Sequence, residues 1–156
     1  LLEQPEPLFL ILENLQDPGN LGTMIRTGEG AGITGVIMNS QTVDIFNPKT
    51  IRATMGSIFR VPFVYVPELS PVLTQMHEKG IHTYAAHLKG KEYYDSFSFR
   101  EPTAFLIGNE GNGLTKEISD QSGQYLKIPM EGKVESLNAS IAAALLMYEA
   151  HRQRKL

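Results

Sequence analysis

Short apolar runs alternate along the chain with longer segments in which apolar residues recur every three or four positions. The runs are typical of buried strands, and the longer segments are typical of amphipathic helices. We expect strands at residues 7–15, 33–39, 61–66, 81–87, 103–107 and 125–130, and helices at 17–32, 48–56, 70–80, 115–122 and 136–150. This alternation predicts an α/β fold with a mostly parallel sheet, helices on both faces and ligands at the carboxyl ends of the strands.

Polar residues and glycines indicate where the helices start and stop. Asp17 and Asn20 are both plausible caps of the first helix, and the glycines at 28, 30 and 32 are expected to end it. Ser136 is the expected cap of the last helix, and its buried stripe is predicted to be Leu137, Ile141, Leu145 and Tyr148. The final residues, HRQRKL, are expected to fray in solvent.

The composition indicates one domain with its own core. Of the 156 residues, 42% are hydrophobic and 20% are charged, which is typical of one compact globular domain. We expect this domain to span residues 8–156. Pro5 and Pro7 predict a semi-rigid linker at residues 1–7, following a domain that this sequence does not include.

Cysteine is absent from the chain. This excludes disulfides, thiolate nucleophiles and thiolate metal sites, and it fits a reducing compartment. The histidines show no ligand spacing, so no metal is expected. No apolar run approaches the ~20 residues of a membrane span, and no basic-then-apolar leader is visible. We therefore expect a cytoplasmic protein with no membrane partner.

The net charge of -3 argues against a protein that holds nucleic acid mainly by bulk positive charge. A local patch remains possible: Lys49, Arg52 and Arg60 fall in one short stretch and either contact RNA phosphates or form a solvated face. The polar loop at 89–102 carries aromatic residues that either stack on unpaired bases or, as we favour, fold onto the core, namely Tyr93, Tyr94, Phe97 and Phe99.

Arg26 is the first candidate for chemistry, since no other cation precedes Lys49. In a helix, Gly22 and Gly30 lie four residues to either side of it on the same face. The guanidinium is therefore expected in a groove that a backbone, a phosphate or a ribose can approach. The alternative is a surface ion pair with Glu29, worth only ~0.3 kcal/mol.

The segment IGNEGNGL, residues 107–114, places three glycines directly after a predicted strand. Such glycines permit positive backbone angles and the close approach of a flat ligand. The spacing is neither the dinucleotide fingerprint nor a P-loop, which makes phosphate cradling improbable. The alternative is a purely structural turn, but Glu110 has no turn-forming purpose that glycine or asparagine would not serve better.

The third candidate segment, residues 128–149, opens the last helix. Ser136 and Asn138 are expected at the positive end of this helix, where exposed backbone donors suit a polar ligand. The alternative, simple capping, explains Ser136 but explains Asn138 poorly. The small residues Ala139, Ala142 and Ala143 permit the close approach of another helix, which could come from a partner subunit.

These three segments, in this order, resemble the catalytic domain of the SpoU (TrmH-type) branch of the SPOUT RNA methyltransferases. The resemblance covers residues 8–149 and rests on DPGNLGTMIRTGEGAG, FLIGNEGNGL and IPMEGKVESLNASIAAALLMYE. It implies a deep trefoil knot in the carboxyl-terminal part of the sheet, S-adenosylmethionine as the cofactor, a homodimer, and methylation of a ribose 2'-hydroxyl in RNA. The opening linker resembles the junction that follows an amino-terminal RNA-binding domain in ribosomal RNA members, so ribosomal RNA is favoured over transfer RNA.

The resemblance also implies roles for individual residues. Asn20 and Arg26 would lie at the reacting ribose, with Ser136 and Asn138 nearby. The cofactor pocket would be formed by Leu106, Ile107, Gly108, Asn109, Glu110, Gly111, Ile128, Met130, Leu137 and Asn138, with Glu110 supporting either the pocket or the dimer. The family's proposed general base is the arginine, but a guanidinium pKa above ~12 favours stabilisation of the developing alkoxide instead.

Two rival functions remain open. The first is a non-catalytic RNA-binding module of the same fold, whose signature would be loss of Arg26 or Asn138; both are present. The second is a nicotinamide-dependent oxidoreductase, which would need a phosphate fingerprint that DPGNLGTM does not supply.

Overall fold

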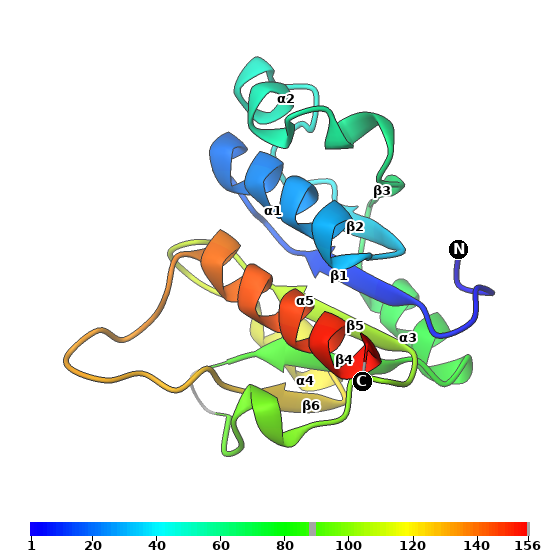
Figure 1. Ribbon diagram of the computed structural model, residues 1–156, viewed down its shortest axis with the longest axis vertical. Coiled ribbons are helices and arrows are strands. Elements are labelled where there is room, and N and C mark those ends of the chain that lie inside the picture. Colours follow the sequence, from blue (N-terminus) through cyan, green and yellow to red (C-terminus); the bar gives the residue numbers. More distant parts are fainter. Residues whose placement is uncertain (88–89, 156) are drawn as a thin grey trace.

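The computed structural model describes residues 1–87 and 90–155, and its centre is a parallel β-sheet (Figure 1). The sheet has six strands in the order β3-β2-β1-β5-β4-β6. Their bounds are β1 Leu8–Leu12, β2 Gly35–Asn39, β3 Phe63–Val66, β4 His82–Ala86, β5 Thr103–Ile107 and β6 Gln124–Leu126. All neighbouring strands run parallel, which confirms the predicted sheet.

Helices cover both faces of the sheet. Helices α1 (Pro18–Ala31) and α5 (Ala139–Lys155) pack side by side on one face, and α3 (Ser70–Glu78) and α4 (Lys116–Gln121) lie on the other (Figure 1). Helix α2 (Pro48–Thr54) and the 3-10 helix η1 (Ser57–Phe59) pack against α1. A second 3-10 helix, η2 (Tyr94–Ser96), precedes β5.

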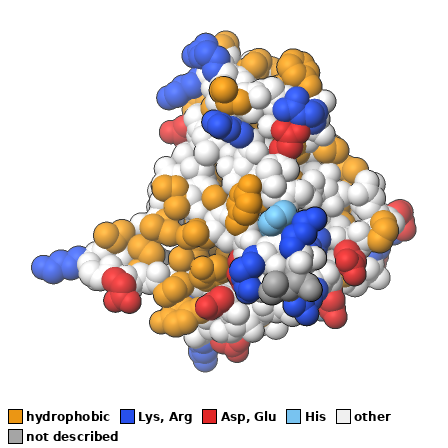
Figure 2. Space-filling model, viewed as in Figure 1, with side chains coloured by type: hydrophobic (Ala, Val, Ile, Leu, Met, Phe, Trp, Pro, Cys, Tyr) orange, Lys and Arg blue, Asp and Glu red, His pale blue; other side chains and the backbone are white. Residues whose placement is uncertain are grey.

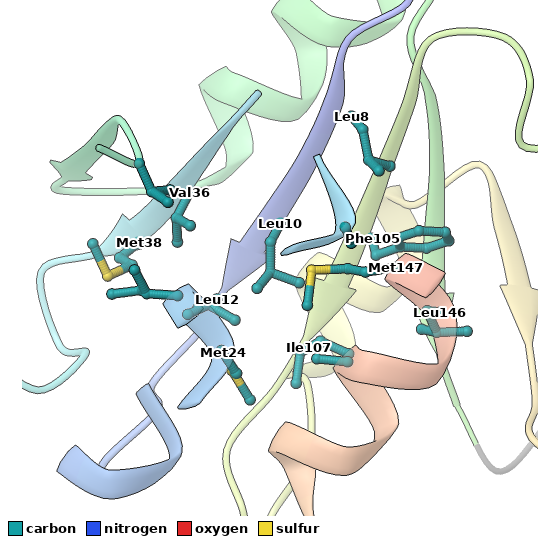
Figure 3. Packing of buried hydrophobic residues seen from close by; sticks show 14 of the residues in the cluster. Leu8, Leu10, Leu12, Met24, Val36, Met38, Phe105, Ile107, Leu146 and Met147 are labelled. Atoms are coloured by element: carbon teal, nitrogen blue, oxygen red, sulfur yellow. The ribbon is translucent and has the colours of Figure 1, made fainter. Parts of the chain in front are cut away.

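The two central strands supply side chains to both layers of the core. Every residue of β1 and β5 is buried, as expected for strands covered on both faces. Along β1, Leu8, Leu10 and Leu12 join the cluster beneath α1 and α5 (Figure 3). Phe9 and Ile11 point the other way, into the cluster beneath α3 and α4. This period of two fixes the register of the sheet against its helices.

Only one of the two expected caps starts α1, and only one of the three glycines ends it. The Asp17 carboxylate accepts a hydrogen bond from the Asn20 N–H at 3.0 Å, so Asp17 is the cap and Asn20 lies inside the first turn. Gly28 and Gly30 are helical. Gly32 ends the helix with a φ of 80°, where a side chain would be strained.

The last helix begins later and faces differently than its sequence predicts. Helix α5 starts at Ala139, because the Asn138 side chain accepts the N–H of Ser140 at 2.8 Å and of Ile141 at 3.4 Å. Ser136 is therefore not the cap. The predicted buried stripe is also wrong, since three of its members are exposed: Ile141 (53%), Leu145 (37%) and Tyr148 (46%). The side chains that pack onto the sheet are Ala143, Leu146, Met147 and Ala150 (Figure 3).

The end of the chain is anchored, which overturns the expected fraying of residues 151–155. Gln153 is buried and accepts the Phe99 N–H at 2.6 Å. The Arg154 guanidinium donates to the carbonyls of Phe99, Glu6, Pro7 and Glu101. Leu156 lies outside the described residues. Arg154 thus ties Glu6 and Pro7, at the end of the expected linker, to the domain, and the role of residues 1–7 as a linker stays a prediction.

Within the expected loop, residues 90–102 fold mostly onto the core, as favoured. Phe99 is fully buried and its ring meets Phe105 edge-on at 4.9 Å, while Tyr94 and Phe97 pack against the same cluster. Tyr93 is exposed, with the Lys127 ammonium 5.0 Å from its ring centre. Residue 89 of this expected loop lies outside the described residues.

Neither a membrane span nor a metal cluster is found in residues 1–87 and 90–155. No helix there is both long and apolar enough to cross a bilayer. No group of three or more histidine, aspartate or glutamate side chains there is arranged to hold a metal ion.

Candidate active site

A cavity of about 380 Å³ opens at the carboxyl ends of β4, β5 and β6, next to the start of α5. This volume is within the range of small-molecule sites. Its walls include most of the residues predicted for a cofactor pocket: Ile107, Gly108, Asn109, Glu110, Gly111, Ile128, Met130 and Leu137. The two segments singled out by sequence, 107–114 and 128–149, thus contribute to one cavity although they lie apart in the chain.

Two predicted pocket residues do not line this cavity. Leu106 is fully buried and belongs to the core cluster on the α3 and α4 side of the sheet. Asn138 caps α5 with its side-chain oxygen, which also accepts the Ser140 hydroxyl at 2.5 Å. Ser136, predicted to act at the ribose, does line the cavity and is exposed.

The glycine turn after β5 folds tightly onto itself. A Cβ on Gly108 would lie 2.2 Å from both the carbonyl carbon of Gly113 and the nitrogen of Leu114, so no side chain fits there. Gly113 has a φ of 70°. The Asn109 side chain accepts the N–H groups of Gly111 and Asn112 at 2.9 and 3.0 Å. Glycine at 108 is thus required by the turn itself, before any ligand is considered.

Glu110 connects this turn to the start of α1. Its carboxylate accepts the N–H of Gln16 at 3.0 Å and the N–H of Asp17 at 2.6 Å. These donors lie in the loop between β1 and α1, where the backbone N–H groups of a helix start favour negative charge. Glu110 therefore fixes the first candidate segment against the second, through two partners in the loop before α1 that the expected supporting role did not specify.

Glu13 makes the reciprocal connection from β1 to the far end of the turn. Its side chain is only 5% exposed, and its oxygens accept the Thr115 N–H at 2.7 Å and the Thr115 hydroxyl at 2.8 Å. Thr115 in turn caps α4, accepting the Ile118 N–H. The two carboxylates, Glu13 and Glu110, thus cross-link the β1–α1 loop with the β5–α4 turn.

An asparagine network completes this cross-link. Asn39, at the end of β2, donates to the Asn14 side chain at 2.8 Å and accepts the Asn14 N–H at 2.9 Å. The Asn109 amide donates to the Asn14 carbonyl at 2.8 Å. Asn14 has a φ of 56°, which asparagine tolerates better than most residues. Three strand ends are thereby joined side by side.

Arg26 does not form the ion pair that was the alternative to a functional role. The Glu29 carboxylate instead binds the Ser57 hydroxyl at 2.7 Å and the guanidinium of Arg60, whose Nη2 lies 2.9 Å away. These hydrogen bonds lower the pKa of Glu29 to about 2. Arg26 is exposed, and its guanidinium has no hydrogen bond or ion pair with the described residues.

The groove expected around Arg26 is partly filled by neighbouring elements. A Cβ on Gly22 would lie 2.4 Å from the Ala53 Cβ, so this glycine lets α2 approach α1. A Cβ on Gly30 would lie 2.6 Å from the Tyr148 hydroxyl of α5. Arg26 therefore projects outward between α2 and α5. Asn20, which lies six residues before Arg26 in α1 and is half-buried, is also outside the cavity walls.

The three cations predicted to contact RNA differ in whether they already form an ion pair within the protein. Lys49 and Arg52 of α2 are exposed and form no ion pair with the described residues. Arg60 is held by Glu29. In Figure 2, basic side chains gather over α2 at the top of the molecule, although the chain as a whole is acidic.

A second hollow lies between α1 and α5, with a volume of about 450 Å³. Its walls include Thr23 and Thr27 of α1 and the exposed apolar side chains Ile141, Leu145 and Tyr148 of α5. Figure 2 shows hydrophobic side chains gathered over the amino-terminal part of α5 and the loop that precedes it. This apolar stripe, Ile141, Leu145 and Tyr148, faces away from the core.

The family model described as the SpoU rRNA methylase family matches residues 7–148. The chain belongs to this family. A 23S rRNA (guanosine(2553)-2'-O)-methyltransferase of Bacillus subtilis is 37% identical over 139 residues, which are 89% of this chain and 56% of that protein.

Solved SpoU structures match the fold closely. The SpoU methyltransferase AviRb from Streptomyces viridochromogenes, in complex with AdoMet, superposes with a TM-score of 0.91 at 32% identity, covering 97% of this chain and 59% of that one. An AdoMet-bound rRNA methyltransferase from Sinorhizobium meliloti superposes with a TM-score of 0.88 at 35% identity, covering 96% of this chain and 57% of that one. The chain thus spans somewhat less than two thirds of the length of these relatives.

Sequence reasoning missed several residues around this SpoU-type cavity. His87 lines it and stacks on Tyr125 with the ring centres 4.8 Å apart, and Glu135 contributes a second carboxylate to its walls beside Glu110. Glu13 carried no motif signal because its partner, Thr115, lies 102 residues away. Its only sequence cue is a carboxylate at the end of an apolar strand.

Proposed function

We propose that this protein transfers a methyl group from S-adenosylmethionine to a ribose 2'-hydroxyl of RNA. The observation that carries the proposal is the cavity that the glycine turn at 108–114 and the segment before α5 form together. Family membership and the AdoMet-bound neighbours support it. The chemistry of the B. subtilis relative supports the ribose 2'-oxygen as the acceptor.

The cavity fits S-adenosylmethionine by chemistry as well as by volume. Ile107, Leu114 and Ile128 offer apolar walls to an adenine ring, and the main chain of the glycine turn offers hydrogen bonds to its edge. Glu110 and Glu135 are carboxylates beside a ligand that carries a positive sulfonium. When bound, this cofactor supplies an electrophilic methyl group and a neutral leaving group.

Arg26 is assigned to the acceptor side. A ribose hydroxyl is a poor nucleophile, so the site must stabilise the negative charge that develops on its oxygen. The guanidinium of Arg26 has no hydrogen bond or ion pair with residues 1–87 and 90–155, and it presents a planar set of donors to that oxygen and to a neighbouring phosphate. Because a guanidinium keeps its proton, Arg26 acts by electrostatic stabilisation and not as the base, and the proton of the 2'-hydroxyl passes to water as the methyl group is transferred. Asn20, Ser136 and Asn138 are proposed to position the ribose.

A homodimer is proposed to complete the site. Arg26 and Asn20 are not among the cavity walls of their own chain. The apolar stripe Ile141, Leu145 and Tyr148 borders α1, and an exposed apolar surface of this kind is typical of a protein interface. A second copy packed on this stripe would bring one chain's Arg26 toward the partner's cavity. The trefoil knot and the cytoplasmic location are likewise proposed on the family resemblance and the absence of cysteine.

Methyl transfer to defined RNA fractions tests the proposal. Ribosomal and transfer RNA from cells lacking the gene are incubated with the purified protein and methyl-labelled donor, and the digested nucleosides are identified by mass spectrometry. We expect 2'-O-methylated nucleosides from ribosomal RNA, with transfer RNA as the alternative, and micromolar donor binding by calorimetry. RNA binding without transfer would support the non-catalytic module, and a base-methylated product or no donor binding would overturn the proposal. Binding of a nicotinamide dinucleotide would instead support the oxidoreductase.

A further inference from the structure

The junction between α2 and η1 exposes two large apolar side chains that follow two exposed cations in the chain. Phe59 is 86% exposed and Met55 is 67% exposed. Arg52 and Lys49 precede Met55 by three and six residues, and both are exposed and without ion-pair partners in the described part of the chain. We call Lys49, Arg52, Met55 and Phe59 the α2–η1 ledge. Hydrophobic and basic side chains lie next to each other over α2 in Figure 2.

The backbone of the ledge is anchored to α1 by buried residues and hydrogen bonds. Thr50 and Thr54 of α2 are fully buried, and Ser57 of η1 is 3% exposed. The Ser57 hydroxyl and the Arg60 guanidinium both bind Glu29 of α1. The backbone that carries Phe59 is therefore fixed against α1 while its ring remains outside.

Met55 adds a backbone cost without a packing gain. Its φ of 50° and ψ of 40° place it in the left-handed region at the end of α2, where glycine is the usual residue. The left-handed backbone conformation is unfavourable for methionine, and burial of the side chain does not offset this cost, because most of the side chain lies in solvent. A contact with a partner molecule would account for this combination.

The ledge borders the residue that is proposed to act on the ribose. Gly22, Arg26 and Glu29 share one face of α1, being four and then three residues apart. Gly22 touches α2, and Glu29 binds η1. Arg26 lies between Gly22 and Glu29 on this face. If Arg26 binds one nucleotide, the next nucleotide in the RNA would reach the ledge.

We propose that the α2–η1 ledge binds unpaired nucleotides flanking the methylated ribose, with Phe59 stacking on a base, Met55 packing beside it, and Arg52 and Lys49 contacting phosphates. This inference rests on the proposed RNA substrate and adds the surface that selects it. Exposed aromatic side chains next to cations are the usual means of binding single-stranded RNA. The stripe on α5 differs, because its three members carry no charge, which suits a second copy of the chain rather than RNA.

Substitutions at Phe59 distinguish stacking from a protein contact. Phe59→Ala is expected to raise the KM for ribosomal RNA from cells lacking the gene about 10-fold, the effect of losing one base–aromatic stack, and to leave donor affinity and oligomeric mass unchanged. Phe59→Tyr keeps the aromatic plane and is expected to retain the wild-type KM. Phe59→Leu keeps an apolar side chain but removes the planar aromatic ring, and its KM is expected to rise as in Phe59→Ala.

Two further variants separate folding from binding. Met55→Gly relieves the left-handed backbone and is expected to keep or raise the melting temperature while raising the KM about 3-fold. Val64→Ala truncates an exposed apolar side chain of β3, 44% exposed, and is the control expected to change neither quantity.

Two results would overturn the inference. One is an unchanged KM in both Phe59→Ala and Met55→Gly. The other is a loss of oligomeric mass in Phe59→Ala that Phe59→Leu restores, which would assign the ledge to a protein interface. If the wild type transfers no methyl group to RNA, the proposed function fails, and fluorescence anisotropy with a labelled 12-nucleotide single-stranded RNA still tests the ledge. Equal affinity of wild type and Phe59→Ala for that probe would then refute it.

Discussion

Glu13→Ala tests whether the crossed carboxylates hold the donor cavity in shape. The substitution deletes a carboxylate that is 5% exposed and leaves the Thr115 N–H and hydroxyl without their acceptor. Both hydrogen bonds are short and charge-assisted, and such bonds contribute about 1.5–3 kcal/mol each. Because both end on one residue, they are not fully additive. We therefore expect the free energy of unfolding to fall by about 3 kcal/mol.

The loss is also expected to appear in donor binding. Thr115 directly follows Leu114, a cavity wall residue, and caps α4. Without Glu13 this end of the glycine turn is released, so the cavity must be reordered when a ligand binds. We expect the Kd for S-adenosylmethionine to rise about 10-fold, which corresponds to ~1.4 kcal/mol of ordering.

Urea denaturation and calorimetry measure the two effects. For a chain of this length, ~3 kcal/mol corresponds to a fall in melting temperature of about 6–12 °C. Glu68→Ala, at an exposed position in the loop before α3, is the control and is expected to change the unfolding free energy by less than about 0.5 kcal/mol. A loss below about 1 kcal/mol in Glu13→Ala, or an unchanged Kd, would refute this reasoning.

Three further predictions concern α1 and α5. Arg26→Lys is expected to lower kcat about 100-fold with little change in donor Kd, because a point ammonium cannot replace the planar donors at a developing oxyanion; near-normal turnover would remove Arg26 from the mechanism. Leu145→Glu is expected to convert a dimer into a monomer in light scattering and to abolish transfer, since it charges the apolar stripe; an unchanged mass would move the interface elsewhere. Glu29→Gln is expected to flatten the dependence of the melting temperature on pH. The pKa of Glu29 in the folded protein, about 2, lies below its ordinary value of 4.5, so the stability that this carboxylate contributes is present above about pH 4.5 and is lost as the pH falls toward 2. A variant whose melting temperature falls as steeply in acid as that of the wild type would contradict this prediction.

The sheet was predictable because its strands leave a strong local signal. A run such as LFLIL at 8–12 can only be buried on both faces, and runs separated by helical segments specify parallel pairing. The strand order and the α1 cap at Asp17 are settled by packing and by one hydrogen bond. Sequence left two candidates for that cap because Asp17 and Asn20 have similar capping propensities.

The contacts that shape the cavity were not predictable, because they join residues far apart in the chain. Glu110 reaches back 93 residues to the Asp17 N–H, and Glu13 reaches forward 102 residues to Thr115. Arg26, three residues away, is the cation nearest to Glu29 in sequence, but Glu29 binds Arg60, directly after η1, instead. The packing of α2 against Gly22 brings Arg60 within reach of Glu29, and Arg26 is left without an ion pair among the described residues.

The error at α5 has a physical cause that also bears on assembly. The segment ASIAAALLMY is apolar or small on every side, so its periodicity cannot say which face packs on the sheet. The side chains that pack against the sheet are Ala143, Leu146 and Met147, whereas those that remain exposed are Ile141, Leu145 and Tyr148. A helix that needed only one apolar face would have polar residues on the other. The apolar residues on both faces are explained if α5 packs on its own sheet and on a second copy of the chain. That second copy would bring its cavity toward Arg26, which has no ion pair among the described residues.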